Sequence, residues 1–182
     1  MTVLTRRPDN LNLLQQVGFK FQLPRAPNFN YFIQKVQFPG VQLPNPRAAN
    51  PFVSVPLPGD QMVFDNLRIT FKIDENLRGY FEILDWIWHL SKPEDFDDSF
   101  EIYKRPPADP EGVYNNGILI MLDSDMIPFL EVTFWEMLPR RLSGFTLESD
   151  VNDIQYITAE VEFDYRVYRY KYLDGLGLPV QN

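Results

Sequence analysis

Cysteine is absent from this sequence of 182 residues, which excludes disulfide bonds, thiolate metal sites and cysteine nucleophiles. The single histidine, His89, would have to serve every Ser–His arrangement alone, and its place near a predicted helix end is more typical of a cap or surface residue. Neither standard spacing of a glycine-rich phosphate loop occurs. We therefore expect no catalytic residue, no cofactor, no metal site and no enzyme activity.

Long hydrophobic runs are also missing. No stretch approaches the roughly 18 apolar residues of a membrane span. The start, MTVLTRRPDN, carries two arginines but no apolar segment typical of a signal peptide. We expect a soluble protein that is made in the cytoplasm of the cell that translates it and has no membrane partner.

Positive charge is scarce: 17 lysines and arginines stand against 25 acidic residues, for a net charge of −8. Binding to a nucleic-acid backbone needs clustered Lys and Arg, whereas an acidic surface lets DNA slide past. Only residues 165–172 interleave tyrosines with the cations Arg166, Arg169 and Lys171, as single-strand binders do. The overall charge favours a protein interface anchored by Tyr and Arg there.

Acidic residues are plentiful but form no defined site. Asp95, Asp97 and Asp98 form one run and Asp123 with Asp125 another, and solvated loops explain both better than a cation site does. A hydrolase that uses two carboxylates stays an alternative, because the sequence gives no separation between them.

Aromatic residues reach 15% and prolines number 16, which favours strands joined by long loops. We expect one mainly β (α+β) domain over 1–182, an antiparallel β-sandwich or barrel flanked by one helix. Strand patterns cover residues 18–23, 29–38, 67–73, 117–138 (a hairpin), 145–150 and 154–173. Residues 1–16 are predicted to be an N-terminal arm, 39–61 and 92–116 long loops, and 174–182 a flexible tail.

The stretch 67–90 changes from strand to helix without a gap. Alternation over 67–73 predicts a half-buried strand, and Asp74 is a favourable N-cap for a helix over about 75–90. Its predicted buried stripe is Leu77, Phe81, Leu84, Ile87 and Trp88. We expect this single helix to close an edge or open end of the sheets.

Two segments carry the candidate subunit contacts. The loop 39–61 holds six prolines and is either a solvated loop or an arm that packs on a neighbouring subunit. The aromatic face of 154–173 switches near its end, which predicts a bulge or a strand that leaves its sheet. The interface candidates are Phe52, Val53, Val55, Leu57, Tyr168, Tyr170 and Tyr172.

The order of these features resembles the tail-tube family of contractile-tailed bacteriophages, and most closely the tail completion proteins (tail tube terminators) of T-even-like phages. The resemblance covers about residues 17–170. It rests on VQFPGVQLP (36–44), PGD…FDNLRITFKIDEN (58–76), FEILDWI (81–87), ILIMLDS (118–124), VTFW (132–135), LESD (147–150) and AEVEFDY (159–165).

The resemblance implies a structural virion protein without enzyme activity. It implies a ring, a hexamer, that joins subunit sheets at the head-proximal end of the tail tube. The ring would end tube polymerisation, contact the tube, sheath and neck (connector) proteins, and admit a tape measure protein or passing DNA without specific binding. Its place would be the tail–neck junction of a virion. Alternatives are a major tail tube protein, a baseplate-side tube initiator, or a β-sandwich module that binds glycans or a host surface.

Overall fold

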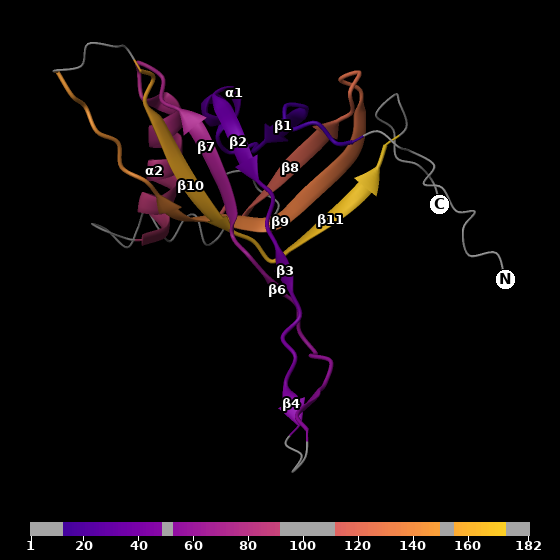
Figure 1. The fold of residues 1–182 in the computed structure, drawn as a ribbon. Helices are drawn as coiled ribbons and strands as arrows, with labels where there is room; N and C mark the ends of the chain where they lie inside the picture. The colour runs from indigo at the N-terminus through magenta and orange to yellow at the C-terminus, as the bar shows by residue number, and fades with distance from the viewer. Residues whose placement is uncertain (1–12, 49–52, 92–111, 150–154, 174–182) are drawn as a thin grey trace.

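The structure, a computed structural model, describes residues 13–48, 53–91, 112–149 and 155–173 (Figure 1). It is a mainly antiparallel β fold with two helices among these residues, α1 (Pro27–Tyr31) and α2 (Arg78–Ser91). The main strands are β1 (Phe19–Gln22), β2 (Ile33–Gln37), β7 (Leu67–Lys72), β8 (Asn115–Leu122), β9 (Pro128–Leu142), β10 (Thr158–Asp164) and β11 (Val167–Tyr172). The predicted mainly β fold class is confirmed.

Strand β9 belongs to two sheets. Its first half pairs with β8 on one side and β11 on the other, and its second half pairs with β10. We call β1-β8-β9-β11 sheet A and β9-β10-β7-β2 sheet B. The chain bends between β10 and β11 beside this change, as Figure 1 shows. The predicted long strand over 154–173 is therefore two strands in different sheets, as the face switch indicated.

The core fills the space between the two sheets. Leu67, Ile69 and Phe71 are buried on β7, while Arg68 on the same strand is exposed, so the predicted alternation is confirmed. Further buried side chains come from every main strand except β2 and β11, and from both helices. They include Phe21, Phe29, Ile83, Trp86, Leu119, Val132, Phe134, Val161 and Phe163.

Helix α2 begins at Arg78, three residues after the predicted start. Asp74 still caps it, because its carboxylate accepts hydrogen bonds from the backbone N–H of Arg78 (3.2 Å) and Gly79 (3.3 Å). Leu77, between Asp74 and the first residue of the helix, has a φ of 55°. This left-handed residue completes a turn before the helix, which the sequence pattern did not indicate.

The buried face of α2 also differs from the prediction. The structure buries Gly79, Ile83 and Trp86, whereas Phe81 is 46% and Trp88 50% exposed. The helix carries apolar residues on two faces, so periodicity alone did not select one. The choice follows from packing: α2 lies so close to α1 that a Cβ on Gly79 would sit 3.2 Å from the Cα of Phe29.

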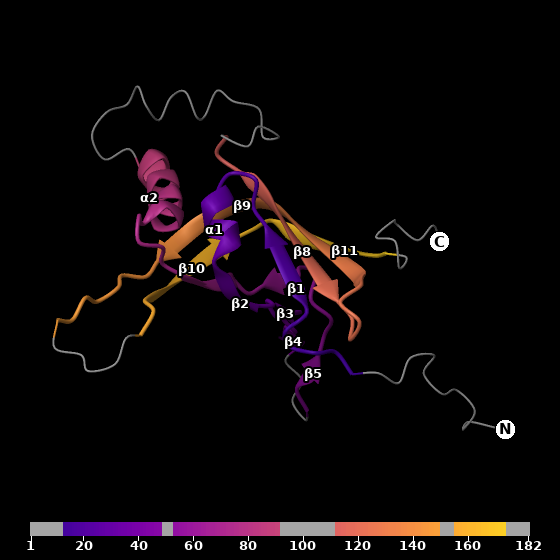
Figure 2. The same cartoon turned by 90° about the horizontal axis from the view of Figure 1, so that it is seen from above.

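Helix α1 replaces the first part of the predicted strand 29–38. Pro27 suits a first helical position, and the side chain of Asn30 binds both the N–H and the C=O of Leu23, each at 2.9 Å. The carboxylate of Glu82 accepts hydrogen bonds from the N–H groups of Asn28 and Phe29, both at 3.1 Å. A side chain 53 residues later in the sequence than Phe29 therefore stabilises α1. Figure 2 shows the two helices side by side.

The proline-rich segment 39–61 is a projecting two-stranded arm rather than a plain loop. Strand β3 (Val41–Gln42) pairs with β6 (Val63–Phe64), and β4 (Arg47–Ala48) pairs with β5 (Val55–Pro56). Figure 1 shows it extending away from the sheets. We call residues 39–64 the arm; residues 49–52 lie outside the described residues.

Several predicted boundaries change. Residues 145–149 form no strand, although 145–150 was predicted as one, and β8 begins at Asn115, inside the predicted loop 92–116. Of the predicted N-terminal arm only 13–16 is described, and the predicted tail 174–182 lies outside the described residues. In the described part of the chain, no helix has the length and apolar character needed to span a membrane.

Candidate subunit interfaces

Sheet A has two free edges among the described residues. Strand β1 pairs only with β8, and β11 pairs only with β9. Every pairing in sheet A is antiparallel, so β1 and β11 run in opposite directions. Each free edge presents unpaired backbone N–H and C=O groups that another strand can bind.

The core-facing side of β11 continues two apolar rows beyond the core. In an antiparallel sheet, directly paired residues lie on one face. The rows are Tyr172–Leu130–Met121–Phe19 and Tyr170–Val132–Leu119–Phe21. Val132, Leu119 and Phe21 are buried, but Tyr170 is 65% and Tyr172 58% exposed. These two predicted interface residues extend a buried surface to an open edge.

Tyr168, a third predicted interface residue, is engaged within the chain. Its ring centroid lies 5.7 Å from that of Phe134 in the core, 5.3 Å from Phe38 and 5.4 Å from Phe64. Phe38 precedes the first residue of the arm, and Phe64 is its last residue. Tyr168 therefore joins β11 to the arm, which the sequence did not indicate.

A hydrogen bond strengthens the same junction. The Tyr165 hydroxyl donates to the backbone oxygen of Asp65 at 2.9 Å, and its ring lies 5.9 Å from that of Phe64. Burial raises the pKa of the Tyr165 hydroxyl, and its neighbours Tyr168 and Asp65 raise this pKa further. We call Phe38, Phe64, Tyr165 and Tyr168 the arm anchor.

The arm itself exposes apolar side chains. Val53 is 67% and Leu57 46% exposed, and Leu43, Met62 and Val63 are similarly open. Val55 lies in β5, and Phe52 lies outside the described residues. Isolated two-stranded ribbons are marginally stable in water, so the arm depends on the arm anchor at its base, and its exposed apolar residues stay candidates for a subunit contact.

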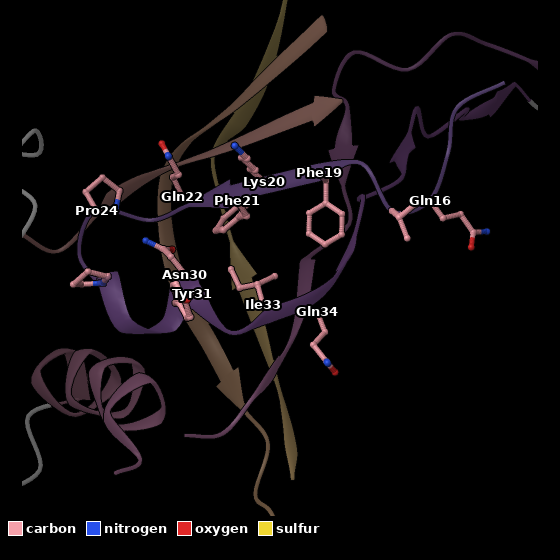
Figure 3. Close-up of a pocket in the computed structure, with 12 residues that line it drawn as sticks. Gln16, Phe19, Lys20, Phe21, Gln22, Pro24, Asn30, Tyr31, Ile33 and Gln34 are labelled. Carbon is pink, nitrogen blue, oxygen red and sulfur yellow. The ribbon is translucent and has the colours of Figure 1, made fainter. Parts of the chain in front are cut away.

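An open seam separates β1 from β2. A cavity of about 760 Å³ lies there. Figure 3 shows Phe19 and Phe21 on the side of β1 that faces Ile33, and Lys20 and Gln22 on the opposite side. The seam combines aromatic rings with the amides of Gln16, Asn30 and Gln34.

The remaining sequence candidates have local roles. Asp123 turns the β8–β9 hairpin, because its carboxylate accepts hydrogen bonds from the N–H groups of Asp125 and Ile127, both at 2.9 Å. A ring nitrogen of His89 contacts the backbone oxygen of Asp85 on the exposed side of α2. The run Asp95 to Asp98 lies outside the described residues. Within the four described segments, no three His, Asp or Glu side chains gather as metal ligands.

No known protein family profile matches the chain, and no curated protein matches its sequence. Solved structures do match its fold. One similar chain comes from the tube terminating cap of the anti-feeding prophage, with a TM-score of 0.62 and 8% identity over 94% of this chain and 99% of that chain. Another comes from the sheath/tube terminator of an extracellular contractile injection system, with a TM-score of 0.56 and 10% identity over 88% of this chain and 97% of that chain. A third comes from the anti-feeding prophage baseplate, with a TM-score of 0.54 and 15% identity over 84% of this chain and 89% of that chain. The chain has this tail-tube-like fold.

Proposed function

We propose that this chain is a structural ring subunit that terminates the tube of a contractile tail. In this ring, β11 of each copy pairs with β1 of the next. The observation that carries the proposal is the pair of free sheet A edges, with Tyr170 and Tyr172 exposed on the core-facing side of one of them. Two apolar rows that end in open tyrosines are incomplete within one subunit.

The strand directions support this joining. Strands alternate in direction across sheet A, so placing β1 of a second copy beside β11 continues the antiparallel order without a reversal. The contact uses different surfaces on the two copies, and such head-to-tail contacts close into rings when the rotation permits. Tyr170 and Tyr172 would then lie beside Phe19 and Phe21 of the next copy, on one continuous apolar face.

The terminator role is supported by the likeness to a chain of a tube terminating cap, over 94% of this chain. We infer a hexamer at the head-proximal end of a phage tail, at the tail–neck junction, where the ring contacts tube, sheath and neck proteins. A tape measure protein or DNA would pass through its lumen. The anchored arm, which projects from one side (Figure 1), is suited to reach the next component.

Growth behaviour tests the proposal. The purified protein is imaged by negative-stain electron microscopy, with light scattering over a concentration series. Six-fold rings that never lengthen support a terminator. Open-ended tubes would assign the chain to the major tube proteins instead. Rings that nucleate added tube protein and stay at the baseplate end would assign it to the initiators, a role that the likeness to a baseplate chain also suggests.

The seam between β1 and β2 favours a second candidate function, a glycan-binding module. Aromatic faces with nearby amides are suited to sugars, and the cavity has a volume usual for small ligands. Ring closure through β1 would place a strand of the next copy beside Phe19 and Phe21. A protein that stays monomeric and binds glycans in an array, with loss of binding in Phe19→Ala, would favour this function.

A further inference from the structure

The outward side of sheet A, which faces away from the core, carries an unexpected charge. Paired residues place two rows on this side, Lys171–Glu131–Ile120–Lys20 and Arg169–Thr133–Ile118–Gln22. Three cations therefore stand against one carboxylate, although the whole chain has a net charge of −8. Lys20, Arg169 and Lys171 are exposed, and no side chain of the two rows is buried.

The tyrosines of β11 lie on the other side of the same strand. Tyr168 pairs with the buried Phe134, whereas Arg169 pairs with Thr133 on the outward side. The interleaved tyrosines and cations of β11 therefore cannot act together on one ligand. Stacking of bases on the β11 tyrosines beside these cations is excluded, but contact of the cations with an anionic backbone is not.

We propose that each β11–β1 junction of the ring forms a binding strip for the phosphodiester backbone of nucleic acid. The strip consists of Arg169 and Lys171 of one copy with Lys20 of the next. It rests on the proposed ring. The two sides of a sheet stay separate across a subunit junction. If Tyr170 and Tyr172 pair with Phe19 and Phe21 of the next copy on the apolar side, the three cations therefore lie together on the outward side. This holds whichever tyrosine pairs with whichever phenylalanine.

The spacing and hydrogen-bond donors of the strip suit the phosphate groups of a nucleic-acid backbone. Arg169 and Lys171 are two residues apart on one strand face, so their Cα atoms are separated by roughly 6.7 Å. Each strand of B-DNA carries one charge per 3.4 Å of helix axis, so a span of this length along the axis holds about two charges of one strand. Arg169 offers a planar fork that matches phosphate oxygens, and Thr133 and Gln22 in its row add hydrogen-bond donors. The contacts read no base, so binding is independent of sequence.

This arrangement makes assembly depend on the anion. Without a polyanion, the junction brings three cations together and their repulsion opposes pairing. A nucleic-acid backbone removes this repulsion, so nucleic acid and ring formation promote each other. The more distant acidic charges act weakly at the strip, because screening acts over about 8–10 Å at physiological salt.

The test measures DNA binding and ring formation on the full chain. Fluorescence anisotropy follows a labelled DNA duplex over a salt series, and sedimentation velocity gives the ring fraction with and without DNA. We expect salt-dependent binding and a higher ring fraction with DNA. The triple variant K20Q/R169Q/K171Q should lose binding, with the salt slope reduced by about 1 for each phosphate contact removed. Lys35→Gln, an exposed cation of sheet B, is the matched control.

A second variant should change DNA binding in the opposite direction from the triple variant. Glu131→Gln removes the one carboxylate of the two rows, so it should strengthen DNA binding and raise the ring fraction. Equal DNA binding by wild type and the triple variant would overturn the inference. Equal promotion of rings by poly-glutamate or by inorganic phosphate would overturn the assignment to nucleic acid.

The two proposals fail in different ways. Rings that form equally well with and without DNA, and that bind none, would overturn the binding strip and leave the ring intact. Absence of rings at every concentration, with and without DNA, would overturn the ring and the strip together. DNA binding by a monomer that the triple variant abolishes would retain the cations as a binding surface but overturn the junction.

Discussion

The hydroxyl of Tyr165 binds the backbone oxygen of Asp65, 100 residues earlier in the chain, at 2.9 Å. This bond ties the bend between β10 and β11 to the base of the arm. Ring contacts of Phe38 and Phe64 with Tyr168 act beside it, and each such pair contributes about 0.5–1.5 kcal/mol beyond area burial. The direction of the arm is therefore coupled to the edge strand that we propose for ring closure.

Removing that hydroxyl tests the coupling. We expect Tyr165→Phe to lower the free energy of unfolding by about 1 kcal/mol, since it leaves the Asp65 oxygen without its donor. The ring fraction should fall as well, because the arm is less firmly held. Urea unfolding and sedimentation velocity measure the two effects. Tyr170→Phe is the control, because it keeps the apolar ring at the proposed interface.

The raised pKa of Tyr165 gives an alkaline prediction. In the unfolded chain this hydroxyl ionises near pH 10, while in the folded chain it stays protonated to higher pH. Above pH 10 the unfolded state binds fewer protons, so the free energy of unfolding falls as pH rises. Urea midpoints from pH 8 to 11 should therefore decline less steeply for Tyr165→Phe than for wild type. Parallel declines would contradict the assignment.

The buried face of α2 can be tested with two tryptophans. Trp86 is 1% exposed and its indole N–H donates to the Val113 oxygen at 3.3 Å, whereas Trp88 is 50% exposed. We expect Trp86→Ala to cost about 3–5 kcal/mol and Trp88→Ala about 0.5 kcal/mol or less. Chemical denaturation measures both. The opposite order would restore the face predicted from periodicity.

Glu82 is expected to stabilise α1 from a distance. Glu82→Ala removes the acceptor for the N–H groups of Asn28 and Phe29, and should cost about 1–2 kcal/mol, as loss of a helix cap does. Asp85→Ala changes an exposed carboxylate on the same helix and is the control. Hydrogen exchange of the Phe29 amide should quicken only in Glu82→Ala.

The interface tyrosines give an assembly prediction. Tyr170→Ala with Tyr172→Ala should abolish rings while the thermal unfolding midpoint stays close to wild type, since both side chains are mostly exposed in one subunit. Tyr156→Ala, also exposed but in the segment before β10, should leave rings intact. Light scattering distinguishes the two variants. Wild-type rings in the double variant would place the subunit contact elsewhere.

Local sequence was sufficient to predict structure where a segment fitted only one pattern. Alternation over 67–73 and the turn at Asp123 are both confirmed, because a strand with one buried face and a side chain that closes its own turn depend on neighbours in sequence. The switch of the aromatic face near Tyr168 also located the change of sheet. These features required no knowledge of distant segments.

The sequence by itself determined the mainly β class, the absence of cysteine chemistry and the segments that carry exposed apolar residues, because composition and period follow from the chain alone. Tertiary structure decided which face of α2 is buried, that residues 27–31 form a helix held by Glu82, and that Tyr168 joins the arm anchor while Tyr170 and Tyr172 remain open. Each of these outcomes depends on contacts between residues far apart in sequence, which no local period specifies.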